Sequence, residues 1–487
     1  MNTESEECRL EAQVLAELAI AAGADEYPQL TKVVDDARAV AVGALDQPPD
    51  LTEQELDRIA VALRRAILRR AHECADEHFR SPEHGVAKVL PSGARLHHSY
   101  ERGATAEHLE ERIARNAGNA AGWASEHVVF SSAMGAMSAL LQCYRAMTQP
   151  THDAPLRFGA WSSYFETDML LELCRGETTG WESLDDLYGA TASGRYQALL
   201  VEPVRYDWDA SVMDIAAFVR AWRSAAPRPR TLILDNTLAS FTWPTERFLS
   251  ALPDGLPHLV VEVRSGLKLD QQGLELANAG VVSVYSCHEN AGTPSAGQFA
   301  AYLRTARALG GTAPSMDGLA AMDTAFVFDR GWTARHAGQV FLHNKALAEA
   351  VSGHGGLFSR IAHPSLHGSP PLRHGPFVVC RLADDTIENH GLLLAVINEE
   401  VRRQRLLLTW GSSFGFRGHR YETILPRVSE RRGLFKVAMG SRGGPSLRAT
   451  LEMMCRLAAY PDFAALRRDY PDVRPVDLMR MAGQGQE

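Results

Sequence analysis

Two side chains that can work together on a cofactor follow two successive strand-like runs of the chain. The apolar run 231–234 ends in Asp235, and the apolar run 259–263 is soon followed by Ser265, two further residues and Lys268. Ligands of open α/β sheets bind beyond the carboxyl ends of the strands, so both side chains are expected at one sheet edge. There a lysine can reach a cofactor while the serine hydroxyl holds a phosphate. Taken singly, such a carboxylate is as often a helix cap, and a lysine is usually a solvated surface group.

A third segment, residues 128–137, has the pattern of a strand, a tight turn of small residues and the start of an apolar helix. A helix N-terminus presents free backbone N–H groups and the positive end of the helix dipole, which suit a phosphate dianion. Ser132 can also be an ordinary N-cap, and the two roles are compatible. By itself this segment is a weak indication of phosphate binding.

The elements that must position these residues alternate between helices and strands. Apolar residues recur at helical spacing from residue 6 to about residue 77, with a break at 47–50, which predicts a helical leader. Beyond it, short β-branched or leucine-rich runs alternate with helical stretches, which predicts an α/β fold with a mostly parallel sheet. We expect a helical N-terminal extension over 1–85, a large domain over 86–330 and a smaller C-terminal α/β domain over 331–487.

Composition and charge exclude several classes of protein. Fifty basic and fifty-nine acidic residues give a formal net charge of −9 without a long basic block, so nucleic acid is not an expected partner. No stretch approaches about eighteen apolar residues, and the N-terminus lacks the pattern of a secretory signal, so no membrane partner is expected. Seven scattered cysteines without a C-x-x-C pair predict reduced thiols in a cytoplasmic protein. No metal site is predicted.

Several short segments occur in a specific order along the chain. They are Y-E-R-G-A-T at 100–105, L-E-E-R-I-A at 109–114, S-S-A-M-G-A at 131–136, Y-F-E-T at 164–167, E-P at 202–203, D-N-T at 235–237 and S-G-L-K at 265–268. Together they resemble the Cys/Met-metabolism family of enzymes that use pyridoxal 5′-phosphate (PLP), which includes cystathionine γ-synthase, cystathionine γ-lyase and methionine γ-lyase. The resemblance covers residues 97–284 well, the C-terminal domain loosely and the helical extension not at all.

The resemblance implies PLP as cofactor and the fold type I of aminotransferases, with a seven-stranded type of sheet. It implies that Lys268 carries PLP as a Schiff base, that Asp235 keeps the pyridine nitrogen protonated, and that Tyr164 stacks on the ring and can exchange a proton at the leaving group. Tyr100 and Arg102 match residues that reach the phosphate of a neighbouring subunit, which implies a homodimer or homotetramer with shared sites. The remaining cofactor-binding residues that it implies are Ser132, Ala133, Met134, Thr237 and Ser265.

Departures from the family pattern concern the phosphate and the substrate. The threonine that precedes the family's lysine is Leu267 here, which removes one phosphate hydroxyl. The arginine that holds the substrate carboxylate in the family aligns with Lys436, which offers a point charge in place of a fork. Arg417 can supply a replacement fork, although an arginine is more often a surface residue. We therefore expect an unusual amino-acid substrate, bound by Ser412, Arg417 and Lys436.

The resemblance implies a lyase or transferase that acts on an amino acid with a leaving group at Cγ, by γ-elimination or γ-replacement. Burial beside a cationic cofactor would lower the pKa of Lys268 and let it move protons between Cα, the cofactor and Cβ. Three alternatives stay open because the expected substrate-binding residues depart from the pattern. They are β-elimination, transamination and a PLP-binding protein without turnover.

Overall fold

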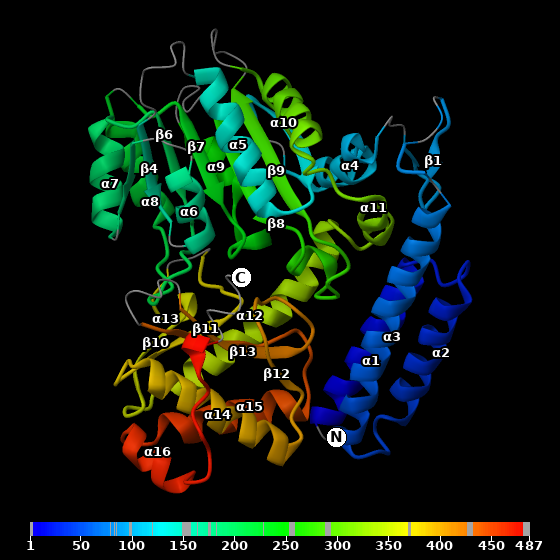
Figure 1. The fold of residues 1–487 in the computed structure, drawn as a ribbon, viewed down its shortest axis with the longest axis vertical. Coiled ribbons are helices and arrows are strands. Elements are labelled where there is room, and N and C mark those ends of the chain that lie inside the picture. The colour runs from blue at the N-terminus through cyan, green and yellow to red at the C-terminus, as the bar shows by residue number, and fades with distance from the viewer. Residues whose placement is uncertain are drawn as a thin grey trace.

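The protein has three parts, which a computed structural model of the chain places side by side (Figure 1). A helical unit runs along one flank of a large sheet domain and a smaller sheet domain. The structure describes all residues except 1–2, 78, 82, 84, 97–99, 119, 149–156, 163, 174–176, 182, 227, 253–258, 288–293, 369–371, 426–431 and 481–487. Within the described part of the chain, no helix has the length and apolar character needed to cross a membrane.

The helical unit comprises α1 (Thr3–Ala21), α2 (Pro28–Gly43) and α3 (Pro49–Asp76). Prolines begin α2 and α3, where the missing N–H costs no helical hydrogen bond. The break predicted at 47–50 is present, and the structure adds a second break at 22–27. Gly23 has a φ of 92° in that second break, a left-handed conformation that glycine adopts readily.

The helical unit shares one hydrophobic core with the large domain. Leu15 and Leu63 belong to the same buried cluster as Leu319 of α11 (Met316–Met322) and Phe326. Helix α3 packs on α11 of the large domain, while α1 packs mainly on α2 and α3. The domain boundaries expected at residues 85 and 330 stay predictions, because the core crosses the first of them.

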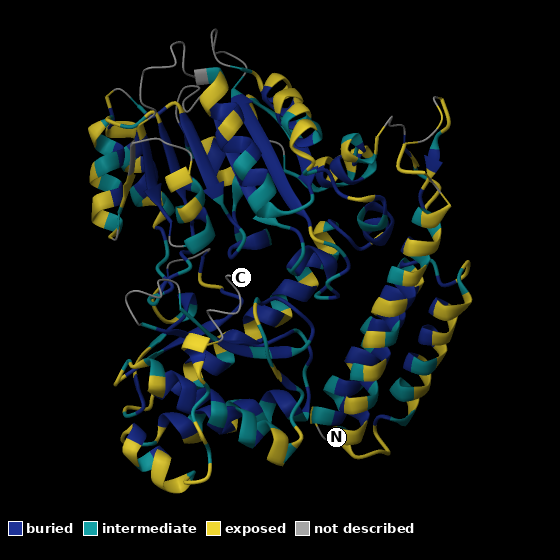
Figure 2. Cartoon of the chain, viewed as in Figure 1, coloured by how far each residue is buried: buried dark blue, intermediate teal, exposed yellow. Residues whose placement is uncertain are grey.

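The large domain is built on a seven-stranded sheet in the order β3–β9–β8–β7–β6–β4–β5. Only β9 runs against its neighbours among the described strands, which confirms the mostly parallel α/β sheet that was predicted. The strands in the middle of the sheet are buried on both faces (Figure 2), as their apolar runs require, whereas Thr179 and Gly180 of the edge strand β5 are exposed. The seven strands are β3 (Trp123–Phe130), β4 (Arg157–Trp161), β5 (Glu177–Gly180), β6 (Ala198–Val201), β7 (Thr231–Asp235), β8 (Leu259–Ser265) and β9 (Gly280–Cys287).

Helices cover the large sheet, and a small hairpin precedes them. The hairpin is β1 (Lys88–Val89) with β2 (Arg95–Leu96), followed by the short turn η1 (Glu101–Gly103). The remaining elements are α4 (Glu107–Asn116), α5 (Ala133–Thr148), α6 (Phe165–Leu173), α7 (Leu184–Ser193), α8 (Ile215–Ser224), η2 (Ser240–Thr242), α9 (Thr245–Ala251), η3 (Leu269–Gln271) and α10 (Ala296–Gly310).

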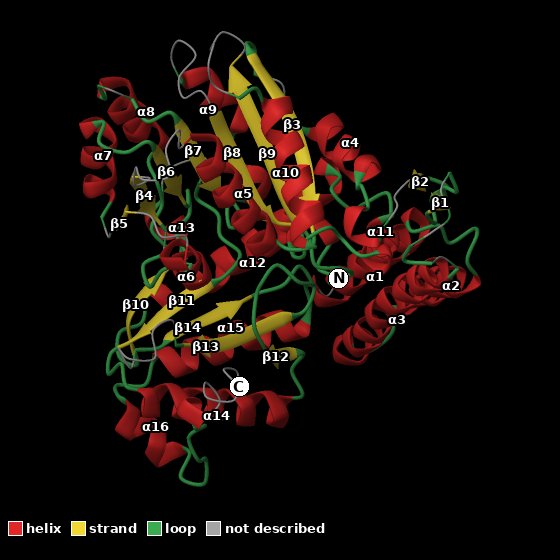
Figure 3. Ribbon diagram, turned by 45° about the horizontal axis from the view of Figure 1, so that its top comes forward, coloured by secondary structure: helices red, strands yellow, loops and turns green. Residues whose placement is uncertain are grey.

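The small domain has a five-stranded sheet in the order β10–β11–β14–β13–β12, of which only β12 and β13 are parallel. The helices α14 and α15 back this sheet (Figure 3) and share its buried core. Its elements are α12 (Arg330–Ser352), β10 (Phe358–Ala362), α13 (Pro364–His367), β11 (Val378–Leu382), α14 (Ile387–Gln404), β12 (Leu408–Trp410), β13 (His419–Ile424), β14 (Leu434–Ala438), α15 (Pro445–Ala458) and α16 (Phe463–Asp469).

A buried carboxylate ties α4 to the edge of the large sheet. Glu110 accepts hydrogen bonds from Arg307 at 2.9 Å, from Arg304 at 3.0 Å and from the backbone N–H of Val129 at 3.1 Å. The side chains of Glu110 and Arg307 are only 7% and 3% exposed. Removing the negative charge would therefore leave a buried guanidinium without its counter-ion.

We expect Glu110→Gln to lower the free energy of unfolding by about 3 to 5 kcal/mol, because it breaks a buried ion pair. The matched control is Glu111→Gln, next in the same helix, whose side chain is 71% exposed and lies 3.9 Å from Arg115. That change should cost less than about 1 kcal/mol. Urea denaturation of the three proteins measures the difference, and equal stabilities would contradict the structural role of Glu110.

Candidate active site

A cavity of about 380 Å³ lies between the carboxyl ends of the large-domain strands and the small domain. The structure brings most of the predicted site residues to its wall. The large domain contributes Ser132, Ala133, Met134, Tyr164, Asp235, Thr237, Ser265 and Lys268, and the small domain contributes Ser412 and Lys436.

A chain of hydrogen bonds joins Lys268 to Asp235 across the ends of β8 and β7. Lys268 Nζ donates to Ser265 Oγ at 3.0 Å, and Ser265 N donates to Thr237 Oγ1 at 3.1 Å. Thr237 N in turn donates to Asp235 Oδ1 at 3.0 Å. The two strands are parallel and adjacent, so their ends bring these four residues to one wall of the cavity.

The cavity shifts both ionisable groups toward their neutral forms. Burial lowers the pKa of Lys268 to about 8, Lys436 acts in the same direction, and Asp235 opposes the shift. Burial raises the pKa of Asp235, while hydrogen bonds from Thr237 and the charge of Lys268 oppose this shift. A protonated ring nitrogen would give the Asp235 carboxylate the cationic partner that burial makes favourable. The residues present therefore fit a PLP ring.

The N-terminus of α5 fits the phosphate of the same cofactor. Ser132 is its N-cap, since Ser132 Oγ accepts a hydrogen bond from Gly135 N at 3.0 Å. Ala133 and Met134 begin the helix and line the cavity. The turn packs closely on β9, because a Cβ atom at Gly280 would lie 2.3 Å from the carbonyl oxygen of Ser132. The start of a 16-residue helix thus points its N–H groups at the cavity.

Glu202 holds the backbone of both tyrosines that line the cavity. Its Oε1 accepts from Tyr164 N at 3.0 Å and from the hydroxyl of Ser162, and its Oε2 accepts from Tyr206 N at 2.8 Å. Burial raises the pKa of Glu202 to about 7, the charge of Asp235 adds to the shift, and the hydrogen bonds oppose it. Tyr206 was missed by the sequence analysis, because it follows its strand without any recurring pattern.

The rings of Tyr164 and Tyr206 complete this wall of the cavity. Tyr164 and Tyr206 meet edge to face, with ring centroids 5.8 Å apart. Burial raises the pKa of Tyr164, and the neighbouring Glu166 adds to the shift. The phenol of Tyr164 is therefore neutral at physiological pH.

Lys436 lines the cavity, but its charge is already matched. Its Nζ lies 2.7 Å from Glu422 Oε1 and 2.8 Å from the hydroxyl of Tyr206. Glu422 also accepts from Ser413 N at 3.2 Å. Sequence analysis missed Glu422 because only the register of β13 on β14, which sets it opposite Lys436, reveals the pair. Binding of a substrate carboxylate by Lys436 stays a prediction, and it would have to compete with Glu422.

Arg417 has a partner other than the expected substrate. Its guanidinium is 8% exposed and lies outside the cavity wall, with Nε 3.1 Å and Nη2 2.5 Å from Glu11 Oε1. A carboxylate of the helical extension therefore occupies the fork that was expected to hold the substrate. Ser412 lines the cavity, and so does Phe414 of the same segment, which sequence analysis did not single out.

Tyr100 and Arg102 lie outside this chain's own cavity. The side chain of Tyr100 is 59% exposed, and the guanidinium carbon of Arg102 stands 5.6 Å from the centre of its ring. Their contact with the phosphate of a neighbouring subunit stays a prediction. Among the residues that the structure describes, no group of three or more His, Cys, Asp or Glu side chains is arranged to hold a metal ion.

No family model and no curated protein matches the chain by sequence. Solved structures do match. A methionine gamma-lyase from Micromonospora echinospora is 18% identical over 81% of this chain and 98% of its own, with a TM-score of 0.53. Cystathionine gamma-lyase from yeast is 17% identical over 80% and 98%, with a TM-score of 0.52. A protein from Listeria monocytogenes, proposed to be an L-allo-threonine aldolase, is 14% identical over 81% and 92%, with a TM-score of 0.50.

At these identities the likeness establishes the architecture of the chain and leaves its chemistry to the site. The mostly parallel seven-stranded sheet and the smaller sheet domain agree with the α/β fold that was expected, and the cavity between them is added by the structure. The chain therefore has the fold of the PLP enzymes of fold type I.

Proposed function

We propose that this protein is a PLP-dependent enzyme that acts on the amino group of a small amino-acid substrate. The proposal rests on the chain of hydrogen bonds that connects Lys268 with Asp235. Both residues line the same cavity as the start of α5. Lys268 would hold the cofactor covalently and Asp235 its ring nitrogen. Ser132, with the N–H groups of Ala133 and Met134, would hold its phosphate.

When bound, PLP withdraws electrons from the carbon that carries the substrate's amino group. The residues of this chain supply the proton transfers around that carbon. With a pKa of about 8, Lys268 is partly neutral near physiological pH, so it can accept a proton and later return it. The neutral Tyr164 phenol can protonate a leaving group. The Phe414 ring, with its centre 5.0 Å from Lys268 Nζ, helps to keep water away from the lysine.

We propose further that the substrate carries a leaving group at Cγ and undergoes γ-elimination or γ-replacement. Support comes from the motif resemblance and from the two gamma-lyases among the structures with a similar fold. Activated homoserines would be offered to the enzyme alone, with a thiol as nucleophile, and with a 2-oxoacid as amino acceptor, and cysteine conjugates would be offered alone. Oxoacid with ammonia from a homoserine indicates γ-elimination, and the same products from a cysteine conjugate indicate β-elimination. Thioether formed with the thiol indicates γ-replacement, and oxoacid formed without ammonia in the presence of the acceptor indicates transamination.

Lys268 is expected to carry the cofactor. Borohydride reduction in the presence of PLP should fix a pyridoxyl group on Lys268, identified by peptide mass mapping, while Lys268→Ala should lose turnover. Because only the neutral amine reacts, the rate of attachment should rise with pH through about 8. Lys345→Ala is the control and should behave as wild type, because Lys345 lies on α12 with its side chain 45% exposed. Attachment to another lysine would refute the assignment.

Asp235→Asn is expected to bind PLP and lose turnover by roughly 100-fold or more, because a neutral partner no longer favours the protonated ring. Asp214→Asn serves as control. Asp214 is the N-cap of α8, and asparagine caps a helix equally well. PLP affinity and initial rates would be measured for both variants. Wild-type turnover of Asp235→Asn would remove this residue from the mechanism.

Arg102 is expected to contribute to the site of a second subunit. Arg102→Ala should weaken cofactor binding by roughly tenfold to a hundredfold, the effect of about 1.5 to 3 kcal/mol for a charge-assisted phosphate contact. At a PLP concentration too low to load the Arg102→Ala sites, mixing Arg102→Ala and Lys268→Ala chains should restore some activity, since one hybrid site carries neither change. No recovery after verified subunit exchange would argue against shared sites.

A further inference from the structure

The helical unit reaches the segment that closes the cavity over Lys268. We propose that Glu11 of α1 is a positioning residue: through Arg417 it holds segment 412–417, and with it the ring of Phe414, against Lys268. This inference builds on the proposed function, in which Lys268 carries the cofactor. It gives the helical unit a role at the site, although none of its residues lines the cavity.

The contact between Glu11 and Arg417 is buried and two-pronged. Both Nε and Nη2 of Arg417 donate to Glu11 Oε1, at 3.1 and 2.5 Å, and the two side chains are 8% and 7% exposed. Arg417 keeps the pKa of the Glu11 carboxyl below its usual value despite burial. Such a pair orders both partners strongly, since separating them leaves a charge without a counter-ion in the interior.

Arg417 ends a short segment that touches the lysine directly. Phe414 and Ser413 line the cavity, and the Phe414 ring centre is 5.0 Å from Lys268 Nζ. Gly415 has a φ of 75°, and a Cβ there would lie 2.8 Å from Leu269 and 3.4 Å from the Cβ of Lys268. The segment therefore packs on the residues around Lys268 without room to shift toward them.

The segment is anchored on its other sides by fixed partners. His336 Nε2 lies 2.9 Å from the carbonyl oxygen of Gly415. Burial and the charge of Arg417 lower the pKa of His336 to about 4, so its ring is neutral and donates this hydrogen bond. The backbone of segment 412–417 is thus bonded to His336 of α12, and its Arg417 side chain is paired with Glu11.

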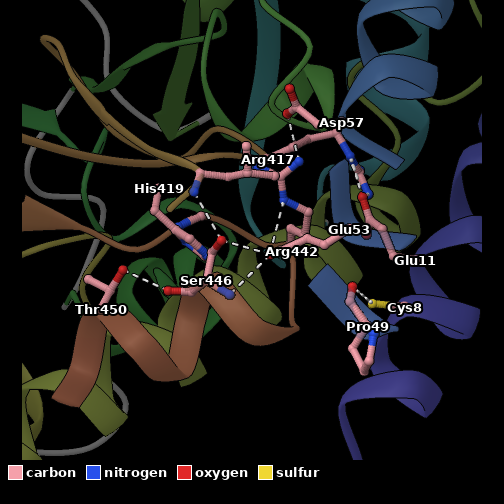
Figure 4. Close-up of polar contacts among 12 residues, drawn as sticks. Cys8, Glu11, Pro49, Glu53, Asp57, Arg417, His419, Arg442, Ser446 and Thr450 are labelled. Carbon is pink, nitrogen blue, oxygen red and sulfur yellow. Dashed lines mark hydrogen bonds and ion pairs between the residues drawn. The ribbon is translucent and has the colours of Figure 1, made fainter. Parts of the chain in front are cut away.

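The helical unit makes further contacts with the chain that follows Lys268 and with the small domain. Arg64 of α3 donates to the carbonyl oxygens of Leu274 and Glu275, shortly after Lys268, at 2.9 and 3.0 Å. Figure 4 shows Glu11, Glu53 and Asp57 facing Arg417 and Arg442. Asp57 lies 2.6 Å from Arg442. The main chain of Arg442 in turn donates to the carbonyl oxygen of Arg417 at 3.1 Å.

The test measures the pKa of the Lys268 amine in the full chain, after any bound PLP has been removed. Competitive labelling with acetic anhydride over a pH series, followed by mass spectrometry of the Lys268 peptide, gives the titration midpoint of its amine. The expected wild-type midpoint is about 8. The other groups that act on Lys268 are Asp235, Lys436 and Glu166, and the variants leave them unchanged.

The variants are Glu11→Gln and the double change Glu11→Gln with Arg417→Gln, which leaves no unpaired buried charge. Releasing segment 412–417 admits water to Lys268, and because burial lowers its pKa, the midpoint should rise by about one pH unit or more. Glu17→Gln is the matched control, since Glu17 lies on the same helix, is 51% exposed and pairs with Arg335. Its midpoint should equal that of wild type.

Each outcome decides the proposal. A raised midpoint in the folded double variant supports it, because a purely structural role would change stability and leave the folded lysine unchanged. An unchanged midpoint overturns it, and so does failure of the double variant to fold, which would make the pair a determinant of folding as a whole. The proposed function is tested separately, because the labelling midpoint is measured without cofactor. Absence of a pyridoxyl adduct on wild-type Lys268 would contradict that function.

Discussion

The parallel pairing of β7 with β8 is the constraint on which the site depends. It places the end of one strand beside the end of the next, so that Thr237 can accept from Ser265 N and Asp235 and Lys268 meet one cavity. Both strands are mostly apolar and buried between helices, and a shift of register would move the side chains that follow them. The lysine and the carboxylate are thus positioned by the core of the sheet.

Electrostatics within the cavity follow from burial more than from any single pair of charges. Burial shifts Lys268, Asp235 and Glu202 toward their neutral forms, and it does so before any ligand is present. Lys436 behaves differently, since Glu422 and Tyr206 keep its pKa above the usual value despite burial. One lysine is therefore prepared to exchange protons and the other to remain a cation that is already paired.

The helical unit changes how the small domain is held. Glu11 and Glu53 of this unit face Arg417 and Arg442 of the small domain, and all four side chains are buried, so separating either pair would be costly. Its apolar faces at the same time belong to the core of the large domain. A single unit thus contacts both domains that enclose the cavity. This explains how Glu11, near the start of the chain, can pair with Arg417 of the small domain.

The sequence by itself determined the α/β class, the strand ends that carry Asp235 and Lys268, and the turn at Ser132. These follow from local patterns, namely apolar runs, turns of small residues and short motifs that occur in a specific order along the chain. Only the tertiary structure decided the partners of the charged residues. The pairing of Lys436 with Glu422 depends on strand register, and that of Arg417 with Glu11 joins residues about four hundred positions apart. Ion pairs of this kind leave no local pattern, because packing of distant elements chooses the partner.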